Sequence, residues 1–247
     1  MKKGNKVIIF KAIVYLILFI TLIYSGSKIY DWHKENVKNT SIAKNINNTA
    51  VTKNENSNEN NKYTVNFNLL KSQNSDTVAW IKVNGTNIEY PVVKSKNNEF
   101  YLNHSFDKTN NSAGWIFADY KNKFDGTDKN IIIYGHNRKD KSMFGTLKNI
   151  LNPEWYNRSE NLDIIFIEKN ENYIYKVFSV YKIEKESYYI KTDFSNNNEF
   201  KKFIETLKKR SIKNFETEIS ESDSILTLST CADNDSYRVV LHAKKSK

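Results

Sequence analysis

The chain begins with a long apolar stretch. Val7 to Tyr24 is apolar over 18 residues, interrupted only by Lys11. That length is about the minimum for a membrane-spanning helix. Lysines precede the stretch, so the positive-inside rule predicts a cytosolic tail at 1–6, an anchor at 7–24 and an extracellular remainder. A cleaved signal peptide is the alternative, with Ser25-Gly26-Ser27 as the cut site. We favour a retained anchor because the run exceeds a usual signal core.

The segment from 25 to 62 is polar and rich in asparagine. It includes Asn-Glu-Asn-Ser-Asn-Glu-Asn-Asn at 54–61, and little in it could be buried. Such composition predicts a flexible linker without a fold of its own. The main domain is expected at 63–247.

From Tyr63 onward, short apolar runs alternate with turn signals. A short helix is predicted over Val65 to Lys71, and Asn84-Gly85 and Lys169 to Asn172 read as hairpin turns. About eight strands are expected, which suits a barrel or a sandwich. The predicted strands are Val78 to Val83, Ile88 to Val93, Gly114 to Ala118, Asn130 to Tyr134, Asp163 to Glu168, Tyr173 to Ile183, Ser224 to Thr230 and Tyr237 to Ala243.

One segment has helical rather than strand spacing. Phe200, Phe203, Ile204 and Leu207 recur within 198–210, with lysines between them. This pattern predicts an amphipathic helix between two strands. We expect its apolar face to pack on the core.

Composition supports a β-rich domain. The chain has 39% hydrophobic and 13% aromatic residues but only seven Gly and two Pro. Its net charge of +10 suits an anionic membrane, an anionic cell wall or nucleic acid. Nucleic acid is disfavoured because no basic stripe interleaved with aromatics is present.

Cys231 is the single cysteine. This excludes an internal disulfide framework and a multi-cysteine metal site, and we expect no metal or cofactor. The thiol is either a buried small hydrophobe or a working nucleophile. Strand alternation puts Leu226 and Leu228 on one face and Thr227, Ser229 and Cys231 on the other, which weakens the buried interpretation.

Arg238 opens the strand that follows Cys231. If the two strands form an antiparallel hairpin, the guanidinium lies beside the thiol, where it could stabilise a thiolate or an oxyanion. Pairing of Arg238 with Asp233 or Asp235 remains an equal alternative from spacing alone.

A cysteine nucleophile generally needs a base, because a free thiol with a pKa of about 8.5 is mostly protonated at neutral pH. Of the four histidines, His33 lies in the linker, His104 in a polar loop, and His242 well beyond Arg238 along the last strand. His136 follows a buried strand directly, where loops present side chains to a site. It is the best base, although spacing does not establish its proximity to the thiol.

Several separated motifs together resemble the class B sortases of Gram-positive bacteria. They occur in that family's order across nearly all of residues 63–247, and the ordered set is more specific than any one motif. The motifs are Asp76-Thr77-Val78-Ala79-Trp80-Ile81, Tyr90-Pro91-Val92-Val93, Asn98-Glu99-Phe100-Tyr101-Leu102, Ala113-Gly114-Trp115-Ile116-Phe117, Tyr134-Gly135-His136-Asn137 with Met143-Phe144 after it, and Thr227-Leu228-Ser229-Thr230-Cys231.

The resemblance implies a mainly β fold, an eight-stranded sortase-type β-barrel with peripheral helices after an N-terminal transmembrane helix. It implies that Cys231 attacks the threonine carbonyl of a C-terminal sorting signal to give a thioester. His136 would move protons, and Arg238 would hold the oxyanion. An amino group of a peptidoglycan cross-bridge or precursor would accept the acyl group. By similarity, the substrate groove would be lined by Asn98, Leu102, Tyr189, Ile190 and Ser229.

Other functions remain open at this point. An exported cysteine peptidase could use the same residues and release its product to water, and a sortase could polymerise pilins instead of anchoring proteins. A non-catalytic module that binds anionic wall polymer is a further alternative. All of these agree with an exported, membrane-anchored domain.

Overall fold

The computed structural model describes residues 3–54, 62–169, 171–231 and 236–246, and the side chains of residues 3–6 and of Cys231 lie outside that description. The chain divides into two compact units, residues 1–38 and residues 39–247.

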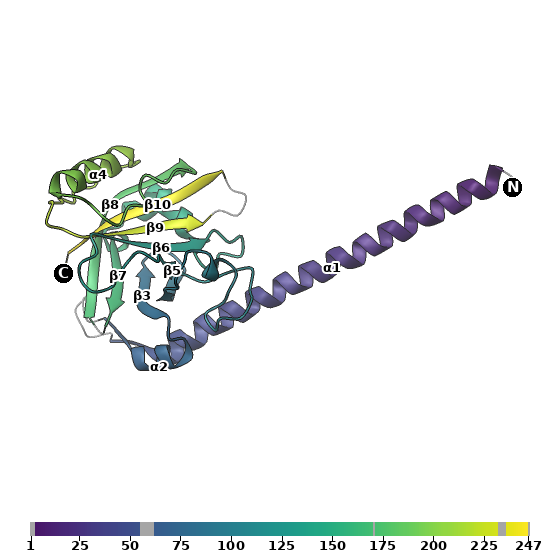
Figure 1. Cartoon of the computed structure of the whole chain (residues 1–247), viewed down its shortest axis with the longest axis horizontal. Helices are drawn as coiled ribbons and strands as arrows, with labels where there is room; N and C mark the ends of the chain where they lie inside the picture. Colours follow the sequence, from purple (N-terminus) through teal and green to yellow (C-terminus); the bar gives the residue numbers. More distant parts are fainter. Residues whose placement is uncertain (1–2, 55–61, 170, 232–235, 247) are drawn as a thin grey trace. The chain divides into compact units, whose positions relative to one another are not determined.

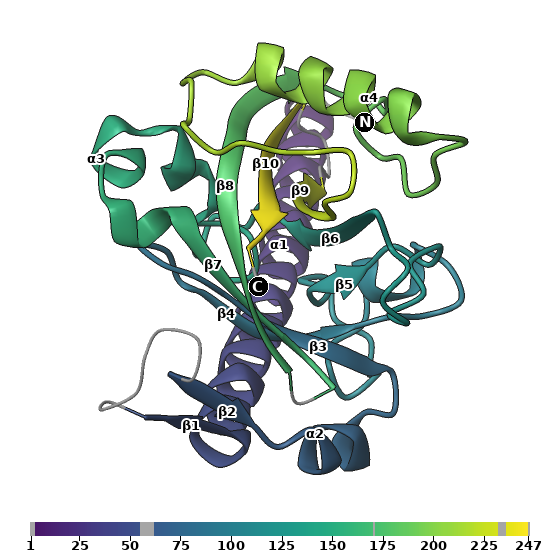
Figure 2. The same cartoon turned by 90° about the vertical axis from the view of Figure 1, so that its left-hand side faces the viewer.

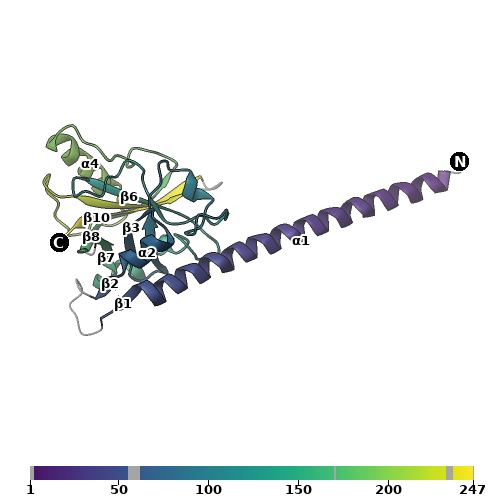
Figure 3. The ribbon, with the colours of Figure 1, turned by 60° about the horizontal axis from the view of Figure 1, so that its bottom comes forward.

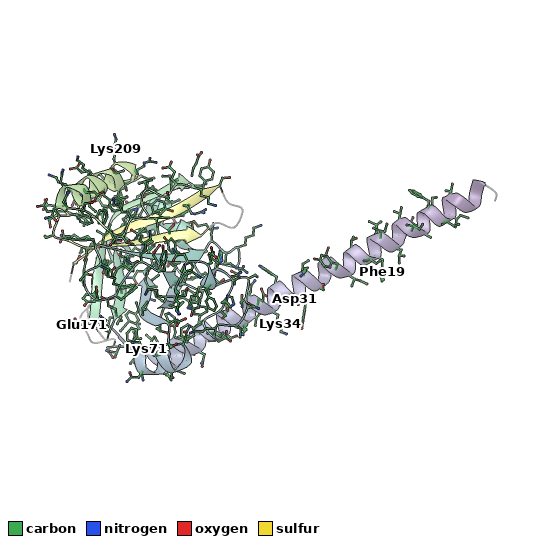
Figure 4. The ribbon with its side chains drawn as sticks, in the orientation of Figure 1. Phe19, Asp31, Lys34, Lys71, Glu171 and Lys209 are labelled. Carbon is green, nitrogen blue, oxygen red and sulfur yellow. The ribbon has the colours of Figure 1, made fainter. Side chains whose placement is uncertain are left out.

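Helix α1 (Lys3–Ala50) provides the described part of the first unit with its residues 3–38, and its last residues, 39–50, belong to the second unit. Its apolar side chains are exposed, Phe19 by 60% and Leu22 by 69%, and Figure 4 shows Phe19 pointing away from the helix axis. An 18-residue window of α1 has a mean hydropathy of 2.6 and no buried share. A helix with exposed apolar residues on all sides suits lipid. This helix is therefore a candidate membrane span.

The segment after the apolar stretch differs from the predicted linker at 25–62. Helix α1 continues to Ala50, and strand β1 (Val51–Lys53) follows it and pairs antiparallel with β2 (Tyr63–Val65) (Figure 3). Residues 55–61 of the predicted linker lie outside the described residues. For residues 25–53, the prediction of a flexible linker without a fold is therefore wrong.

A hidden helical face explains this difference. Asn39, Ala43, Ile46 and Ala50 are spaced at four, three and four residues, and all are at most 8% exposed. Residues at this spacing share one side of a helix. The Asn39 Nδ2 atom also donates a hydrogen bond to the Gly114 carbonyl at 2.9 Å. The second compact unit therefore begins well before the predicted domain boundary.

In the described part of the second unit, eight strands form a closed barrel, in the order β10-β8-β7-β3-β4-β5-β6-β9 (Figure 1). This confirms the barrel expected from the sequence. The strands are β3 (Thr77–Val83), β4 (Ile88–Val93), β5 (Phe117–Ala118), β6 (Asn130–His136), β7 (Asp163–Glu168), β8 (Glu171–Glu184), β9 (Ile225–Cys231) and β10 (Tyr237–Lys245).

Two neighbouring pairs in the barrel are parallel, β4 with β5 and β6 with β9. Parallel strands need a long crossover connection. The connection from β6 to β9 contains β7, β8 and several helices. Because the strands run in the same direction, the C-terminal ends of β6 and β9 meet at one edge of the barrel.

The described helices outside α1 are short, apart from α4 (Asn197–Arg210). The Asn196 side chain caps α4 by accepting from the Glu199 backbone N–H. Its predicted apolar face is buried, and Lys209 points away from the barrel (Figure 4). The others are α2 (Phe67–Gln73), η2 (Phe100–Leu102), η3 (Leu147–Leu151), α3 (Pro153–Tyr156) and η4 (Ser159–Leu162).

The buried apolar side chains form two clusters. The larger cluster draws on all eight barrel strands. The smaller one joins α4 to β8, β9 and β10, and includes Tyr181, Tyr189 and Val240 (Figure 2). The wall formed by β8, β9 and β10 is thus packed on both faces, which explains why the hydroxyl-bearing face of β9 is buried as well as its leucine face.

Candidate active site

The ends of β6 and β9 bring two predicted site residues to neighbouring positions. In the parallel register, Gly135 pairs with Thr230 and His136 pairs with Cys231. These two positions lie far apart in the sequence, and the ladder alone makes them neighbours. The backbone of Cys231 is described as the last residue of β9, whereas its side chain lies outside the described residues.

Arg238 lies on the other side of the same strand end. Strands β9 and β10 are antiparallel, with Val240 paired to Ser229, and the same register continued by two residues sets Arg238 opposite Cys231. The Val239 N–H donates to the Thr230 hydroxyl at 3.0 Å, so a side chain extends the pairing toward the strand end. The alternative partners Asp233 and Asp235 lie outside the described residues.

The imidazole of His136 is held in one orientation. The ring is buried, and its Nε2 lies 2.6 Å from the Leu102 carbonyl oxygen. A carbonyl can only accept, so Nε2 carries the hydrogen of this bond. In the neutral ring, Nδ1 is then the nitrogen that can take up a proton.

Two glycines make room for this arrangement. Gly114 has a φ of +60°, and a Cβ there would lie 2.7 Å from the Leu102 carbonyl oxygen and 2.9 Å from the His136 ring. A Cβ on Gly135 would lie 2.5 Å from Ile116 and 2.7 Å from Phe144. Both positions therefore exclude larger residues, because atoms around His136 and the end of β6 are closely packed.

The other histidines lie elsewhere. The His104 ring stacks on Phe100 at 4.0 Å, and its Nδ1 donates to the Phe100 carbonyl at 2.7 Å. His242 is fully buried between β8 and β9, and His33 belongs to the first unit. None of these three occupies a position paired with Cys231, as His136 does, although no described histidine, His136 included, is among the residues that line the cavity beside the strand ends.

A cavity of about 300 Å³ lies beside these strand ends. It brings together Arg238 and all five positions expected to line a substrate groove. Four further residues share its wall and were missed by sequence reasoning. The lining residues are Asn98, Leu102, Phe117, Tyr134, Lys185, Tyr189, Ile190, Ser229, Thr230 and Arg238.

The side chains of this cavity are fixed by hydrogen bonds. The Asn98 amide donates to Asp119 Oδ2 at 2.8 Å and accepts from the Tyr120 N–H at 2.9 Å. The same carboxylate accepts from the Tyr134 hydroxyl at 2.9 Å. Asp119 is buried, and its only sequence signal was its place after a short strand.

On the opposite wall, the Tyr189 hydroxyl lies 3.0 Å from Ser229 Oγ. Tyr189 is fully buried and Ile190 is half-buried. The cavity is thus a mixed slot, with aromatic and aliphatic side walls, amide and hydroxyl groups, and a guanidinium near the strand ends. Such a slot suits an extended peptide, whose backbone needs polar partners and whose side chains need apolar contacts.

The described residues hold no group of three or more His, Cys, Asp or Glu side chains that could bind a metal ion. The backbone positions of His136, Cys231 and Arg238 lie close together at one end of the barrel. Nucleophilic chemistry by a thiol would need a base and a cation at such neighbouring positions.

Comparison with known proteins gives a consistent result. The family model described as the sortase domain matches residues 81–246. The chain is 32% identical over 238 residues to sortase B of Staphylococcus aureus, covering 95% of this chain and 96% of that protein.

Solved structures agree with this result. The sortase B–substrate complex of Staphylococcus aureus has a TM-score of 0.70 at 36% identity, covering 74% of this chain and 85% of that one. Sortase B of B. anthracis in complex with AAEK1 has a TM-score of 0.75 at 35% identity, covering 87% of this chain and 99% of that one.

Proposed function

The chain belongs to the sortase family and is a cysteine transpeptidase of the sortase B type, and from that premise we propose that it cleaves C-terminal sorting signals after threonine. The cleaved protein passes through a thioester on Cys231 to an amino group of the cell wall. The observation that carries this proposal is the pairing of His136 with Cys231 at the ends of two parallel strands.

The first half-reaction forms the thioester. The Cys231 thiolate attacks the threonine carbonyl carbon, and the Cys–S–C bond replaces the C–N bond of the scissile peptide. The leaving amine takes a proton from Nδ1 of His136, while the Leu102 carbonyl holds the other ring nitrogen. Arg238 donates hydrogen bonds to the oxyanion of the tetrahedral intermediate.

The second half-reaction transfers the acyl group. An amine of a peptidoglycan cross-bridge or its precursor attacks the thioester, gives its proton to His136 and releases Cys231 as the thiolate. The enzyme returns to its starting protonation state, and no external reductant or oxidant is needed. Asn98, Leu102, Tyr189, Ile190 and Ser229 would hold the sorting signal, in support of which they line the same cavity.

The place of action follows from the first unit. We propose that the apolar part of α1 anchors the enzyme as a single-pass protein, with residues 1–6 in the cytosol and the catalytic domain outside. The 18-residue window with mean hydropathy 2.6 supports this, as do the lysines that precede the apolar stretch.

The test uses the full-length chain in detergent micelles. Peptides of Asn-Pro type that continue for at least one residue beyond the threonine are supplied with and without an amine acceptor such as triglycine, and products are identified by mass. Ligated product that disappears in Cys231→Ala supports transpeptidation. Turnover that ignores every acceptor indicates a peptidase, and ligation only to a lysine side chain of a pilin-like protein indicates a polymerase. Unchanged cleavage by Cys231→Ala would reject the enzyme mechanism.

A further inference from the structure

A buried chain of hydrogen bonds runs beside the cavity, centred on His242. Its links are 2.7–3.0 Å long and connect β8, β10, β9 and β6. The groups, in order, are the Tyr188 hydroxyl, the Tyr181 hydroxyl, His242 Nε2 and Nδ1, the Thr227 hydroxyl, the Asn130 side-chain amide and the Lys191 carbonyl.

The direction of each bond is determined by its neighbours. The Thr227 hydroxyl donates to Asn130 Oδ1 at 2.7 Å, so it accepts from His242 Nδ1–H at 2.9 Å. His242 Nε2 then accepts a hydrogen bond from the Tyr181 hydroxyl at 2.8 Å. Tyr181 in turn accepts from Tyr188 at 3.0 Å. This series of hydrogen bonds is complete only when His242 is neutral.

Burial enforces this state. His242 and Thr227 are 0% exposed, and Asn130 is 0% exposed as well. Desolvation lowers the pKa of His242 to about 3, so the ring stays neutral over the physiological range. Removing one partner leaves a buried donor or acceptor without water, which costs more than the bond itself contributes.

Both ends of the chain of bonds lie on one short segment. Tyr188 and Lys191 belong to the connection between β8 and α4, and Tyr189 and Ile190, which line the cavity, lie between them. The N–H of Ile190 donates within the segment, to the Ser187 carbonyl. Side-chain bonds, rather than a strand ladder, therefore join the ends of this segment to the barrel.

We propose that the His242-centred network positions residues 188–191 as the peptide-binding wall of the cavity and so sets affinity for the substrate peptide. The inference rests on the proposed function, because it assigns this wall to sorting-signal binding. His242, Tyr181, Thr227 and Asn130 are positioning residues, since they act on the substrate through Tyr189 and Ile190.

The first test breaks one end of the network. Tyr188→Phe removes a single hydroxyl and keeps the ring that Arg210 covers at 4.7 Å. Its matched control is Tyr156→Phe, another half-buried tyrosine beneath a cation, Lys213 at 4.9 Å. Loss of one hydrogen bond should raise KM for the peptide about five-fold and leave kcat within about two-fold. The control should keep the wild-type KM.

The second test breaks the network centrally. Thr227→Val removes the hydroxyl and Thr227→Ser retains it, so valine should raise KM and serine should restore it. Thr77→Val controls for the substitution, because Thr77 is equally buried and donates to the Asn74 carbonyl. If the network acts as one unit, Tyr188→Phe adds little to Thr227→Val. Additive effects, or a fall in kcat at unchanged KM, would overturn the proposal.

A readout without turnover separates this inference from the proposed function. Hydrogen exchange of the full chain in micelles should speed up across residues 185–196 in Tyr188→Phe and Thr227→Val, and remain unchanged in β7. Unchanged exchange at 185–196 rejects the network as a positioning element, whatever the activity. Faster exchange in a protein that cleaves no sorting-signal peptide would instead reject the proposed function and keep the structural role. If Thr227→Val does not fold, the exchange result for Tyr188→Phe, a substitution at a half-buried position, decides the test by itself.

Discussion

Two regions beside the cavity are held by different kinds of bond. In the first, His136 and Cys231 occupy paired positions at the end of a backbone ladder that begins at Asn130 and Ile225. In the second, Tyr189 and Ile190 lie on an irregular segment whose ends are held by side-chain hydrogen bonds. The proposed reacting positions are thus held by main-chain hydrogen bonds, and the proposed peptide-binding wall by side-chain hydrogen bonds.

This difference separates the expected effects of substitution. Backbone ladders tolerate most side-chain changes. Activity should therefore be lost at the strand ends only when the strand-end side chains themselves, or the residues packed against them, are altered. The 188–191 wall should respond to distant substitutions that leave the chemistry untouched. Rate constants therefore report on the first region, and Michaelis constants on the second.

The largest effect is expected for His136→Ala. Without the base, the thiol is mostly protonated and the leaving amine has no proton donor, so kcat should fall about 10³-fold or more with little change in KM. Steady-state kinetics with a sorting-signal peptide measures this. His33→Ala, at an exposed position of the first unit, is the control. A His136 variant with near-normal kcat would remove the strand-end cluster from the mechanism.

Next comes Arg238→Lys. An ammonium keeps the charge but lacks the planar, multi-donor fork, so the oxyanion loses its bidentate partner and kcat should fall about 10²-fold to 10³-fold. The exposed Arg158→Lys tests whether arginine loss in general matters. Arg238→Lys with wild-type kcat would assign the guanidinium to peptide binding rather than to the oxyanion.

Gly114→Ala should have an intermediate effect through geometry. The added Cβ would collide with the Leu102 carbonyl that holds His136, and a misplaced base can cost about 10²-fold in kcat. Gly126→Ala is the matched control, because Gly126 also has a positive φ, +91°, but no neighbour within 4 Å. It should cost about 1 kcal/mol of stability and no activity. Equal kinetics for the two variants would contradict the role of the Leu102 carbonyl.

The last prediction concerns the pH dependence of stability, for which the smallest change in activity is expected. Desolvation lowers the pKa of His242 to about 3 in the folded chain, whereas an unfolded histidine titrates near 6.5. The unfolded chain therefore binds a proton first, and stability falls as pH drops from about 6.5 toward 3, by up to about 1.4 kcal/mol per pH unit. His242→Gln should lose this part of the slope in chemical unfolding of the full chain. An identical slope would show that His242 is protonated when folded.

The strand-end cluster could be predicted in part from local patterns. Alternation along 224–231 and 237–243 put Cys231 and Arg238 on adjoining strand ends, because the hairpin connecting them is short. The pairing of His136 with Cys231 could not be derived in this way. It depends on a parallel crossover of many residues. The position of His136 after a buried strand made it the best candidate base, but only the family resemblance indicated that it belongs with Cys231.

The wall at residues 188–191 and the start of the second unit at Asn39 were harder to predict from the sequence. Nothing local in the sequence indicates that Tyr181 of β8 pairs with Val240 of the last strand. The asparagine-rich composition also concealed the helical part of the chain that follows the apolar stretch. Asn39 is buried as a hydrogen-bond donor to Gly114, so a residue counted as a linker signal is part of the core.

The parallel pairing of β6 with β9 also bears on the order in which the proposed active site forms during folding. Contacts between residues so distant in sequence form late, since a large loop must close first. A chain folded only as far as β8 contains His136 but has neither Cys231 nor the strand beside which His136 lies. The proposed active site can therefore form only after β9 and β10 have closed the barrel.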